Sequence, residues 1–167
     1  MTFPSPTGPA LAREEVFLLY LDYFRERVIE KVSALPLDAL VVSVVPTDWT
    51  ALELLQHLTY VEMRWLEWGF EGQSVEAPWG DQVGDRWFVD SEESPESLID
   101  ALRERGVKTS LIVRRHDLDE RGQPGPRWSG DEPASLERVL FHLIQEYARH
   151  LGHLDIYSEL VDVPGGE

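Results

Sequence analysis

Four long stretches of this chain carry apolar residues at helical spacing, and segments containing proline, glycine and acidic residues separate them. The stretches cover residues 10–34, 50–70, 94–115 and 134–161. Apolar residues that recur every three to four positions place one face of each helix against a core. Four amphipathic helices of this length pack most simply around a single core, so the sequence predicts an all-α, four-helix-bundle fold.

The boundaries of three of these helices carry recognisable signals. Leu35-Pro36 ends the first helix, because proline disfavours helical geometry in the residue before it. Thr50 and Glu53 have the spacing of a capping box at the start of the second. Ser94-Pro95 combines an N-cap residue with proline at the first helical position of the third. The pattern of the third helix is interrupted near Gly106, which makes it the weakest of the four.

Two connections join the helical stretches. Residues 71–94 form a long connection containing Trp79, Trp87 and Phe88, and residues 117–132 form a loop rich in glycine and proline. Connections this long without regular structure are uncommon and often functional. The aromatic residues favour a first connection that packs onto the body of the protein. With 167 residues, the chain is expected to be one domain, residues 1–167.

Composition excludes several classes of function. The net charge of −16 argues against a nucleic-acid partner, because binding phosphates requires clustered Lys and Arg. The chain has no cysteine, so it has neither disulfides nor a thiolate of its own. No apolar run has the length of a membrane span, and MTFPSPTGPA lacks the basic and apolar segments of a signal peptide. A cytoplasmic location without membrane partners is the expectation.

The last helical stretch contains an unusual run, EYARHLGH, at residues 146–153. Glu146, His150 and His153 are spaced by four and three residues, and His142 lies one turn earlier. Glu146 and His150 fall on one flank of the apolar stripe, facing partly inward, whereas His142 and His153 lie further round. Side chains four apart on a helix have Cβ atoms about 5–6 Å apart, so two of them can bind one divalent ion.

A third ligand has to come from another helix. His57 is the only histidine in the first 115 residues and lies at the edge of the second helix's apolar face. If the second and last helices are neighbours, His57 meets Glu146 and His150 in the core. Two histidines and a carboxylate leave coordination positions open, as in catalytic zinc sites. The ordinary alternative is a set of hydrogen-bonded core histidines, with Glu146 paired to Arg149.

Two segments together resemble a known family. They are DWTALELLQHLTYVEMRW, residues 48–65, and LERVLFHLIQEYARHLGHLDIYSEL, residues 136–160. Both resemble the DinB-like family, and in particular its branch of mycothiol-dependent enzymes, which includes maleylpyruvate isomerase. The resemblance extends over the whole chain. It implies a four-helix bundle whose long crossover joins helices two and three, so that these two helices run parallel.

The resemblance also implies a set of metal ligands. Family members bind a divalent metal through one histidine of the second helix and two residues four apart on the last helix. His57, Glu146 and His150 occupy these positions. Many DinB-like proteins have histidine in place of Glu146, whereas the mycothiol-dependent isomerases have glutamate. His153 stands where many members have glutamine, and His57, His150 and His153 form the alternative set.

The function implied is that of a metal-dependent thiol S-transferase or thiol-dependent isomerase that acts on a small electrophile. The thiol would be mycothiol, or else bacillithiol or glutathione. The metal would be zinc, although nickel, iron and manganese suit the same ligands. One alternative is a metal-dependent hydrolase, in which Glu53 or His153 serves as base. Another is a non-enzymatic helical module whose metal, if any, only stabilises the bundle.

Two further expectations concern surfaces. Arg64 lies seven residues after His57 on nearly the same side of the helix, and it is a candidate to bind a carboxylate of substrate or cofactor. The ordinary interpretation, which we favour, is an exposed surface arginine. Phe17, Tyr20 and Phe24 make the first helix more aromatic than one core stripe requires, which suggests a homodimer.

Overall fold

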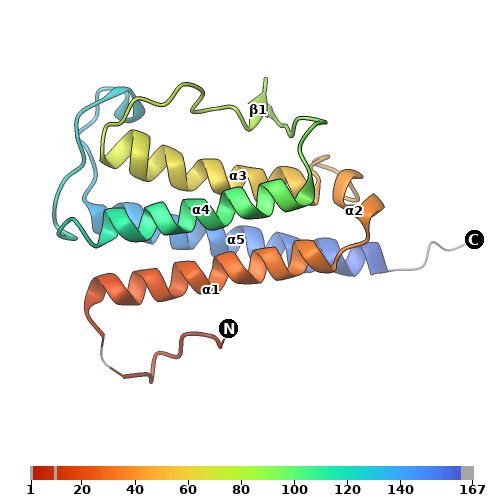
Figure 1. The fold of residues 1–167 in the computed structure, drawn as a ribbon, viewed down its shortest axis with the longest axis horizontal. Helices are drawn as coiled ribbons and strands as arrows, with labels where there is room; N and C mark the ends of the chain where they lie inside the picture. The colour runs from red at the N-terminus through yellow and green to blue at the C-terminus, as the bar shows by residue number, and fades with distance from the viewer. Residues whose placement is uncertain (1, 10, 163–167) are drawn as a thin grey trace, which may run out of the picture.

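The computed structural model describes residues 2–9 and 11–162, and its architecture is a bundle of four long helices (Figure 1). The connections between the four long helices contain short helical segments and one small hairpin of two two-residue strands. In chain order the elements are α1 (Arg13–Ala34), α2 (Leu37–Val41), α3 (Ala51–Met63), η1 (Arg64–Phe70), β1 (Gln82–Val83), β2 (Arg86–Trp87), α4 (Pro95–Val113), η2 (Pro126–Trp128) and α5 (Leu136–Asp162).

The arrangement confirms the all-α bundle and its crossover. α1 packs against α5 and α4, while α3 packs against α4 and α5. α3 and α4 run in the same direction, because the segment between them returns along the length of the bundle (Figure 1). α3 and α5 are therefore neighbours that run in opposite directions. This pairing is what a site shared between the second and last long helices requires.

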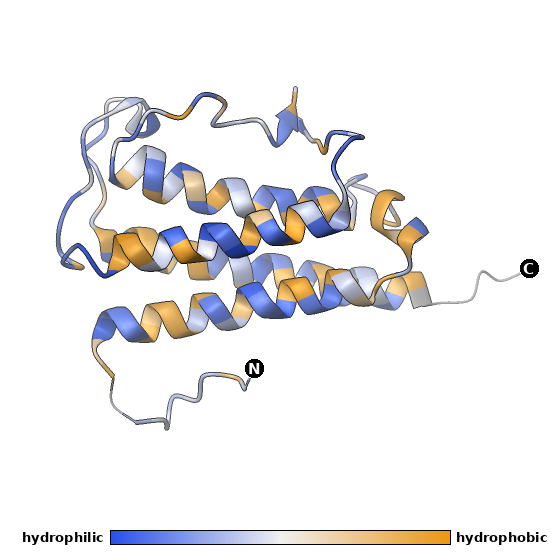
Figure 2. Ribbon diagram, in the orientation of Figure 1, coloured by the Kyte–Doolittle hydropathy of each residue, from blue (hydrophilic) through white to orange (hydrophobic). Residues whose placement is uncertain are grey.

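Burial of apolar stripes holds the bundle together. All four long helices alternate apolar and polar residues along their length (Figure 2), and their buried leucine, isoleucine and valine residues belong to one continuous core. Thr50 and Glu53 form the predicted capping box at the start of α3. Ser94 caps α4 through a reciprocal pair of hydrogen bonds with Ser97, and Pro95 follows as the first helical residue.

Three details differ from the sequence-based expectation. The first long helix begins at Arg13 rather than Ala10, which lies outside the described residues. The second changes to π-helical geometry over Arg64–Phe70, where the amide of Glu71 bonds the carbonyl oxygen of Leu66 at 2.8 Å. The 71–94 connection also contains the small β1–β2 hairpin, which the sequence pattern did not indicate.

Gly106, near which the apolar pattern of the third predicted helix is interrupted, lies inside a continuous α4. A Cβ atom at this position would lie 2.6 Å from Cζ of Arg25, which reaches across from α1. Glycine costs helix stability, but here it leaves the space that the guanidinium fills. The interruption therefore reflects a close contact between two helices rather than the end of one.

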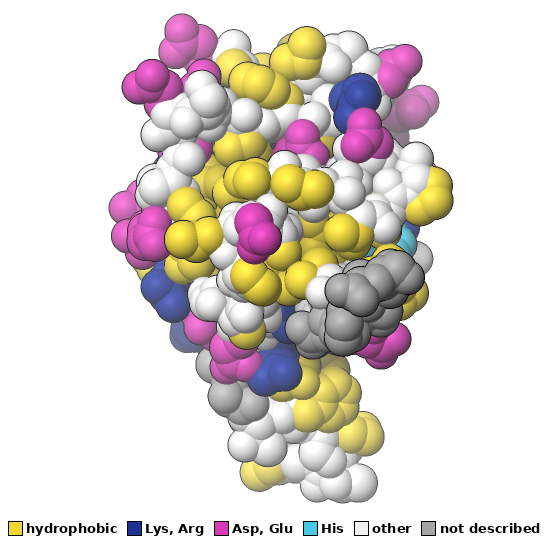
Figure 3. Space-filling view, turned by 90° about the vertical axis from the view of Figure 1, so that its right-hand side faces the viewer, with side chains coloured by type: hydrophobic (Ala, Val, Ile, Leu, Met, Phe, Trp, Pro, Cys, Tyr) yellow, Lys and Arg dark blue, Asp and Glu magenta, His cyan; other side chains and the backbone are white. Residues whose placement is uncertain are grey.

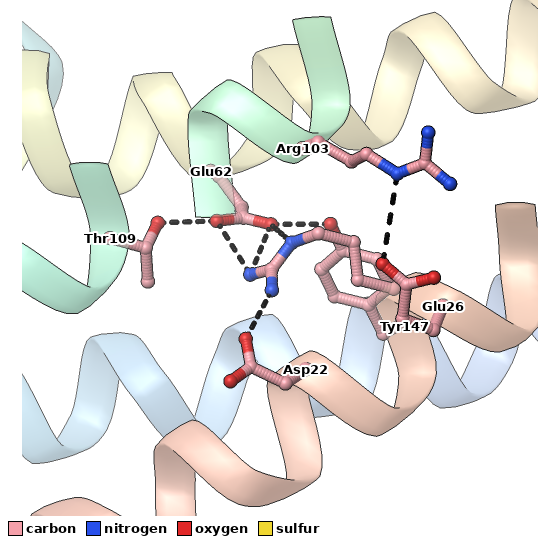
Figure 4. A network of polar contacts seen from close by, with 7 residues as sticks. Asp22, Glu26, Glu62, Arg103, Thr109 and Tyr147 are labelled. Carbon is pink, nitrogen blue, oxygen red and sulfur yellow. Dashed lines mark hydrogen bonds and ion pairs between the residues drawn. The ribbon is translucent and has the colours of Figure 1, made fainter. Parts of the chain in front are cut away.

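Arg25 belongs to a buried polar network centred on Glu62, which is 0% exposed (Figure 4). The Arg25 guanidinium donates to Glu62 Oε1 from Nε at 3.1 Å and to Oε2 from Nη2 at 3.1 Å. The hydroxyls of Thr109 and Tyr147 donate to the same carboxylate. Because these residues lie on α1, α3, α4 and α5, one carboxylate links all four long helices.

Hydrophobic side chains gather on the end of the bundle where α2 lies (Figure 3). Leu37, Val41 and Val42 are exposed there. On α1, by contrast, part of the aromatic surface is covered by the chain itself, since the Tyr20 hydroxyl donates to Pro4 O and Phe3 packs edge-on against Tyr23. Within the described residues, no helix combines the length and apolar character needed to cross a bilayer.

Candidate metal centre

Three potential metal ligands converge between α3 and α5. His57 on α3 and Glu146 and His150 on α5 each offer a ligand atom, and these atoms all lie within 4.8 Å of one another. The antiparallel packing of α3 on α5 produces this convergence, and the four-residue spacing on α5 stacks Glu146 and His150 on one face. The structure thus brings together the three residues that the sequence singled out.

Asp81 fixes the ring of His57. Its Oδ2 lies 3.1 Å from Nδ1 of His57, which leaves Nε2 as the ring nitrogen available to a metal. A carboxylate on the far nitrogen of a metal-binding histidine sets the tautomer and increases the basicity of the ligand. Burial lowers the pKa of His57, and the hydrogen bond to Asp81 opposes that effect. A neutral ring near neutral pH is the form that binds metal.

Arg64 holds Asp81 in turn, and the expectation that Arg64 is exposed was wrong. Its side chain is buried, with 3% of the residue exposed. Nη1 and Nη2 donate to the two oxygens of Asp81 at 2.6 and 3.1 Å. Burial alone would raise the pKa of Asp81, but the bonds from His57 and Arg64 hold it below its ordinary value. Because its donors face Asp81, Arg64 is placed to orient that carboxylate rather than to receive one from a ligand.

On α5, His150 lies between two other site residues. Its Nε2 is 3.3 Å from Oε2 of Glu146, and its Nδ1 is 3.3 Å from Nδ1 of His153. The hydrogen bond from His150 holds the pKa of Glu146 below its ordinary value, so Glu146 is an anion at neutral pH. His153 meets His150 at the nitrogen turned away from Glu146. It lies behind the cluster and is not among the three converging ligands.

Aromatic rings enclose the cluster. Trp87 of β2 stacks on the His57 ring at a centroid distance of 4.3 Å and lies edge-on to His150 at 5.4 Å. Trp49 packs against His153. The 71–94 connection therefore supplies one wall of the site through Trp87 and a polar support through Asp81. A wall of indole limits the access of water and strengthens electrostatic interactions within the site.

Sequence reasoning missed Asp81 and the specific role of Trp87. Both lie in an irregular segment whose path back over the bundle is invisible to helical periodicity. Glu53, considered as a base for a hydrolase, accepts a hydrogen bond from the amide of Thr50 in the capping box. His142 approaches Glu146 with Nε2 at 3.8 Å from Oε1, at the outer side of the cluster.

The donor set fits a divalent cation. Two ligand atoms that each lie about 2.1 Å from a tetrahedral ion are roughly 3.4 Å apart. Nε2 of His150 lies 3.3 Å from Oε2 of Glu146, and the ligand atoms of all three residues lie within 4.8 Å of one another. Two imidazoles and one carboxylate, in addition, leave at least one coordination position for an exogenous ligand. The Asp81 carboxylate on the far ring nitrogen of His57 is the kind of partner that metal-binding histidines generally have.

Comparison with known proteins identifies the family and supports the fold. The family model for mycothiol S-transferases matches residues 16–163. The chain belongs to the mycothiol S-transferase family. Its fold is similar to the crystal structure of a DinB-like protein from Bacillus cereus ATCC 10987, with a TM-score of 0.61 and 18% identity over 92% of this chain and 97% of that chain. No curated protein sequence matches the chain. The resemblance to the DinB-like family is thereby confirmed.

In this family member we expect Asp81→Asn to weaken divalent-metal affinity by about 10–100-fold, because loss of a carboxylate that orients a metal-binding histidine typically has that effect. Competition between the protein and a chromogenic chelator measures the change. Arg64→Met is the matched control, since it removes the other partner of Asp81 but leaves the contact with His57. An equal loss of affinity in both variants would show that local packing, rather than the His57 contact, sets the affinity.

Proposed function

We propose that this protein transfers a low-molecular-weight thiol, mycothiol in the first instance, to a small electrophile at a divalent metal held by His57, Glu146 and His150. The family match and the convergence of these three side chains between α3 and α5 support the proposal. The single observation that carries it is the open donor set of two imidazoles and one carboxylate. Zinc is the proposed metal, because it accepts these ligands in a tetrahedral site.

A bound divalent ion would supply positive charge that lowers the pKa of a thiol and so maintains it as a thiolate near neutral pH. The residues of the chain would orient the metal ligands, adjust the charge of the site and limit the access of water. Asp81 orients His57, and Glu146 contributes a negative charge that moderates the charge of the site. Trp87 shields the cluster from water. The absence of cysteine from the chain agrees with a thiol that arrives as a co-substrate.

The reaction balances without an oxidant. The thiol loses its proton to solvent or buffer, its sulfur forms a bond to carbon of the electrophile, and the leaving group departs with the electron pair. Held next to the electrophile, the sulfur gains the rate advantage of proximity and orientation. A cytoplasmic location and a homodimer stay predictions, as does the choice of mycothiol over bacillithiol or glutathione.

Formation of a thioether from 1-chloro-2,4-dinitrobenzene tests the function. Untagged protein would be metal-depleted, reloaded with zinc, and assayed with mycothiol, bacillithiol and glutathione in turn. We expect the zinc-loaded protein to accelerate adduct formation with one of the three thiols, and Glu146→Gln to abolish the acceleration. Glu137→Gln, a glutamate on α5 outside the cluster, is the matched control. Ester hydrolysis in the absence of thiol, without adduct formation, would instead favour a hydrolase.

A further inference from the structure

Arg127 is a half-buried cation without an anionic partner among the described residues. Its guanidinium lies over the ring of Trp65, with Cζ 3.7 Å from the ring centroid. Its Nε is enclosed and has no hydrogen-bond partner among the described residues, and no carboxylate of that part of the chain lies within 4.0 Å of its guanidinium. Arg138 and Arg149 also lack such a partner there, but both are exposed.

The lack of a partner is unexpected in this protein. Acidic residues outnumber basic residues by 31 to 15, so a carboxylate is available to most arginines. Burial lowers the pKa of Arg127, and the nearby charge of Arg64 lowers it further. Burying part of a cation without an anionic partner, and near a second cation, is unfavourable in free energy. An anion supplied from outside the chain would remove that cost.

Arg127 lies on the same side of the bundle as the metal centre. The Trp65 ring that it covers contacts the ring of His142 edge-on at a centroid distance of 4.6 Å. His142 in turn approaches Glu146, as described above. A continuous line of side chains therefore leads from the metal centre to the guanidinium. The positive charge of Arg127 also affects His142. Burial is the main cause that lowers the pKa of His142; Glu146 opposes this effect, and Arg127 adds to it.

The position of Arg127 is fixed by its surroundings. It lies in η2, where the Trp128 indole donates to Gly69 O at 3.2 Å and to Gln123 O at 2.9 Å. A Cβ atom on Gly69 would lie 3.2 Å from Cγ of Arg127, so the stem of the arginine packs closely on η1. The π-helical geometry of η1 thus presents Trp65 and receives the arginine stem. π-helical turns of this kind are frequent at functional sites.

We propose that Arg127 binds a carboxylate of the electrophilic substrate, with the flat part of that substrate lying along Trp65 and His142 toward the metal centre. This inference rests on the proposed function and specifies its substrate class as small carboxylic acids that carry an electrophilic carbon. Arginine suits the role because its planar guanidinium pairs with a carboxylate through two parallel hydrogen bonds. The Trp65 ring covers one face of the guanidinium, and Nε is the only one of its three nitrogens that is enclosed without a partner among the described residues, so Nη1 and Nη2 are the donors for that pairing.

Calorimetric titration with benzoate, and with benzamide as its uncharged counterpart, tests the subsite independently of catalysis. The protein would be titrated both as purified and after chelation, because benzoate could otherwise bind a metal directly. We expect benzoate to bind in both states, at least tenfold more tightly than benzamide, as a charge-assisted hydrogen bond predicts. Arg127→Gln should abolish the preference, and Arg127→Lys should retain part of it. Arg121→Gln, an exposed arginine in the same loop, is the matched control.

A second experiment tests whether the proposed carboxylate subsite contributes to the binding of a reacting substrate. Thioether formation from 4-(bromomethyl)benzoate and from 4-(bromomethyl)benzamide would be compared in parent and Arg127→Lys proteins. We expect the parent to show a KM at least tenfold lower for the acid, and the variant to lose most of that difference with little change in kcat. If no thioether forms from these two compounds or from 1-chloro-2,4-dinitrobenzene but benzoate still binds through Arg127, the proposed function fails and the subsite stands. Benzoate binding that is absent, or unchanged in Arg127→Gln and Arg127→Lys, would overturn the subsite itself.

Discussion

Substitution of any one of the three converging ligands is expected to lower divalent-metal affinity by roughly 100-fold or more. Loss of a residue that only orients a ligand weakens metal binding about 10–100-fold, and loss of a direct ligand is expected to weaken it more. Purified, untagged parent protein should carry about one metal per chain by elemental analysis. His57→Ala, Glu146→Gln and His150→Ala should each lose it, while circular dichroism shows that the helices remain.

His153→Ala is the informative control for that experiment, because His153 is adjacent to His150 but lies behind the cluster. We expect the variant to keep its metal. Retention in Glu146→Gln with loss in His153→Ala would move the site to His57, His150 and His153. If the parent protein binds no metal under any loading condition, the proposed chemistry fails and the three side chains are only core residues.

The second large effect concerns the buried carboxylate of Glu62. Glu62→Leu leaves the Arg25 guanidinium, in a residue that is 4% exposed, without its principal anion, and leaves the hydroxyls of Thr109 and Tyr147 without an acceptor. Breaking a buried ion pair from one side typically costs about 3–5 kcal/mol. We expect the free energy of unfolding, measured by chemical denaturation, to fall by about that amount, which is a large share of the stability of a typical domain.

Two further variants make this prediction specific. The double variant Arg25→Leu, Glu62→Leu removes both charges, so it should recover much of the lost stability, because apolar replacement of a whole buried pair is often tolerated. Glu30→Leu breaks an exposed pair with Arg27 and should have little effect. A Glu62→Leu protein as stable as the parent would show that the network contributes specificity of packing rather than stability.

Local sequence patterns predicted the four long helices, and together with the family resemblance they singled out the three side chains that converge between α3 and α5. The spacing of Glu146 and His150 is a property of a single helix. The position of His57 followed once α3 and α5 were assumed to be neighbours. The capping residues Thr50 and Ser94 were likewise readable, because an N-cap depends only on residues within one turn. The helical spacings and the caps depend on residues within one or two helical turns, so they can be predicted from the sequence alone.

Features that depend on long-range contacts were not predictable in this way. Asp81 lies 24 residues after His57 in an irregular segment, so no periodicity connects the two. Without Asp81, nothing distinguished Arg64 from an ordinary exposed arginine. Arg127 is conspicuous only once the structure shows that no carboxylate within the described residues approaches it. Gly106 was taken as a weakness of its helix because the residue that fills its space, Arg25, is on a different one.

Glu146 and Tyr147 are consecutive residues of α5 that face two different polar systems. Glu146 belongs to the candidate metal centre. The hydroxyl of Tyr147 donates to Glu62 on α3, five residues after His57. Sliding or rotating α5 far enough to move Glu146 would also break the bond between Tyr147 and Glu62. The bond between Tyr147 and Glu62 therefore fixes how α5 is rotated and positioned relative to α3 next to the site. At the proposed metal site, ions of different radius would then have to be accommodated by side-chain torsions, since α3 and α5 could not readily shift against each other.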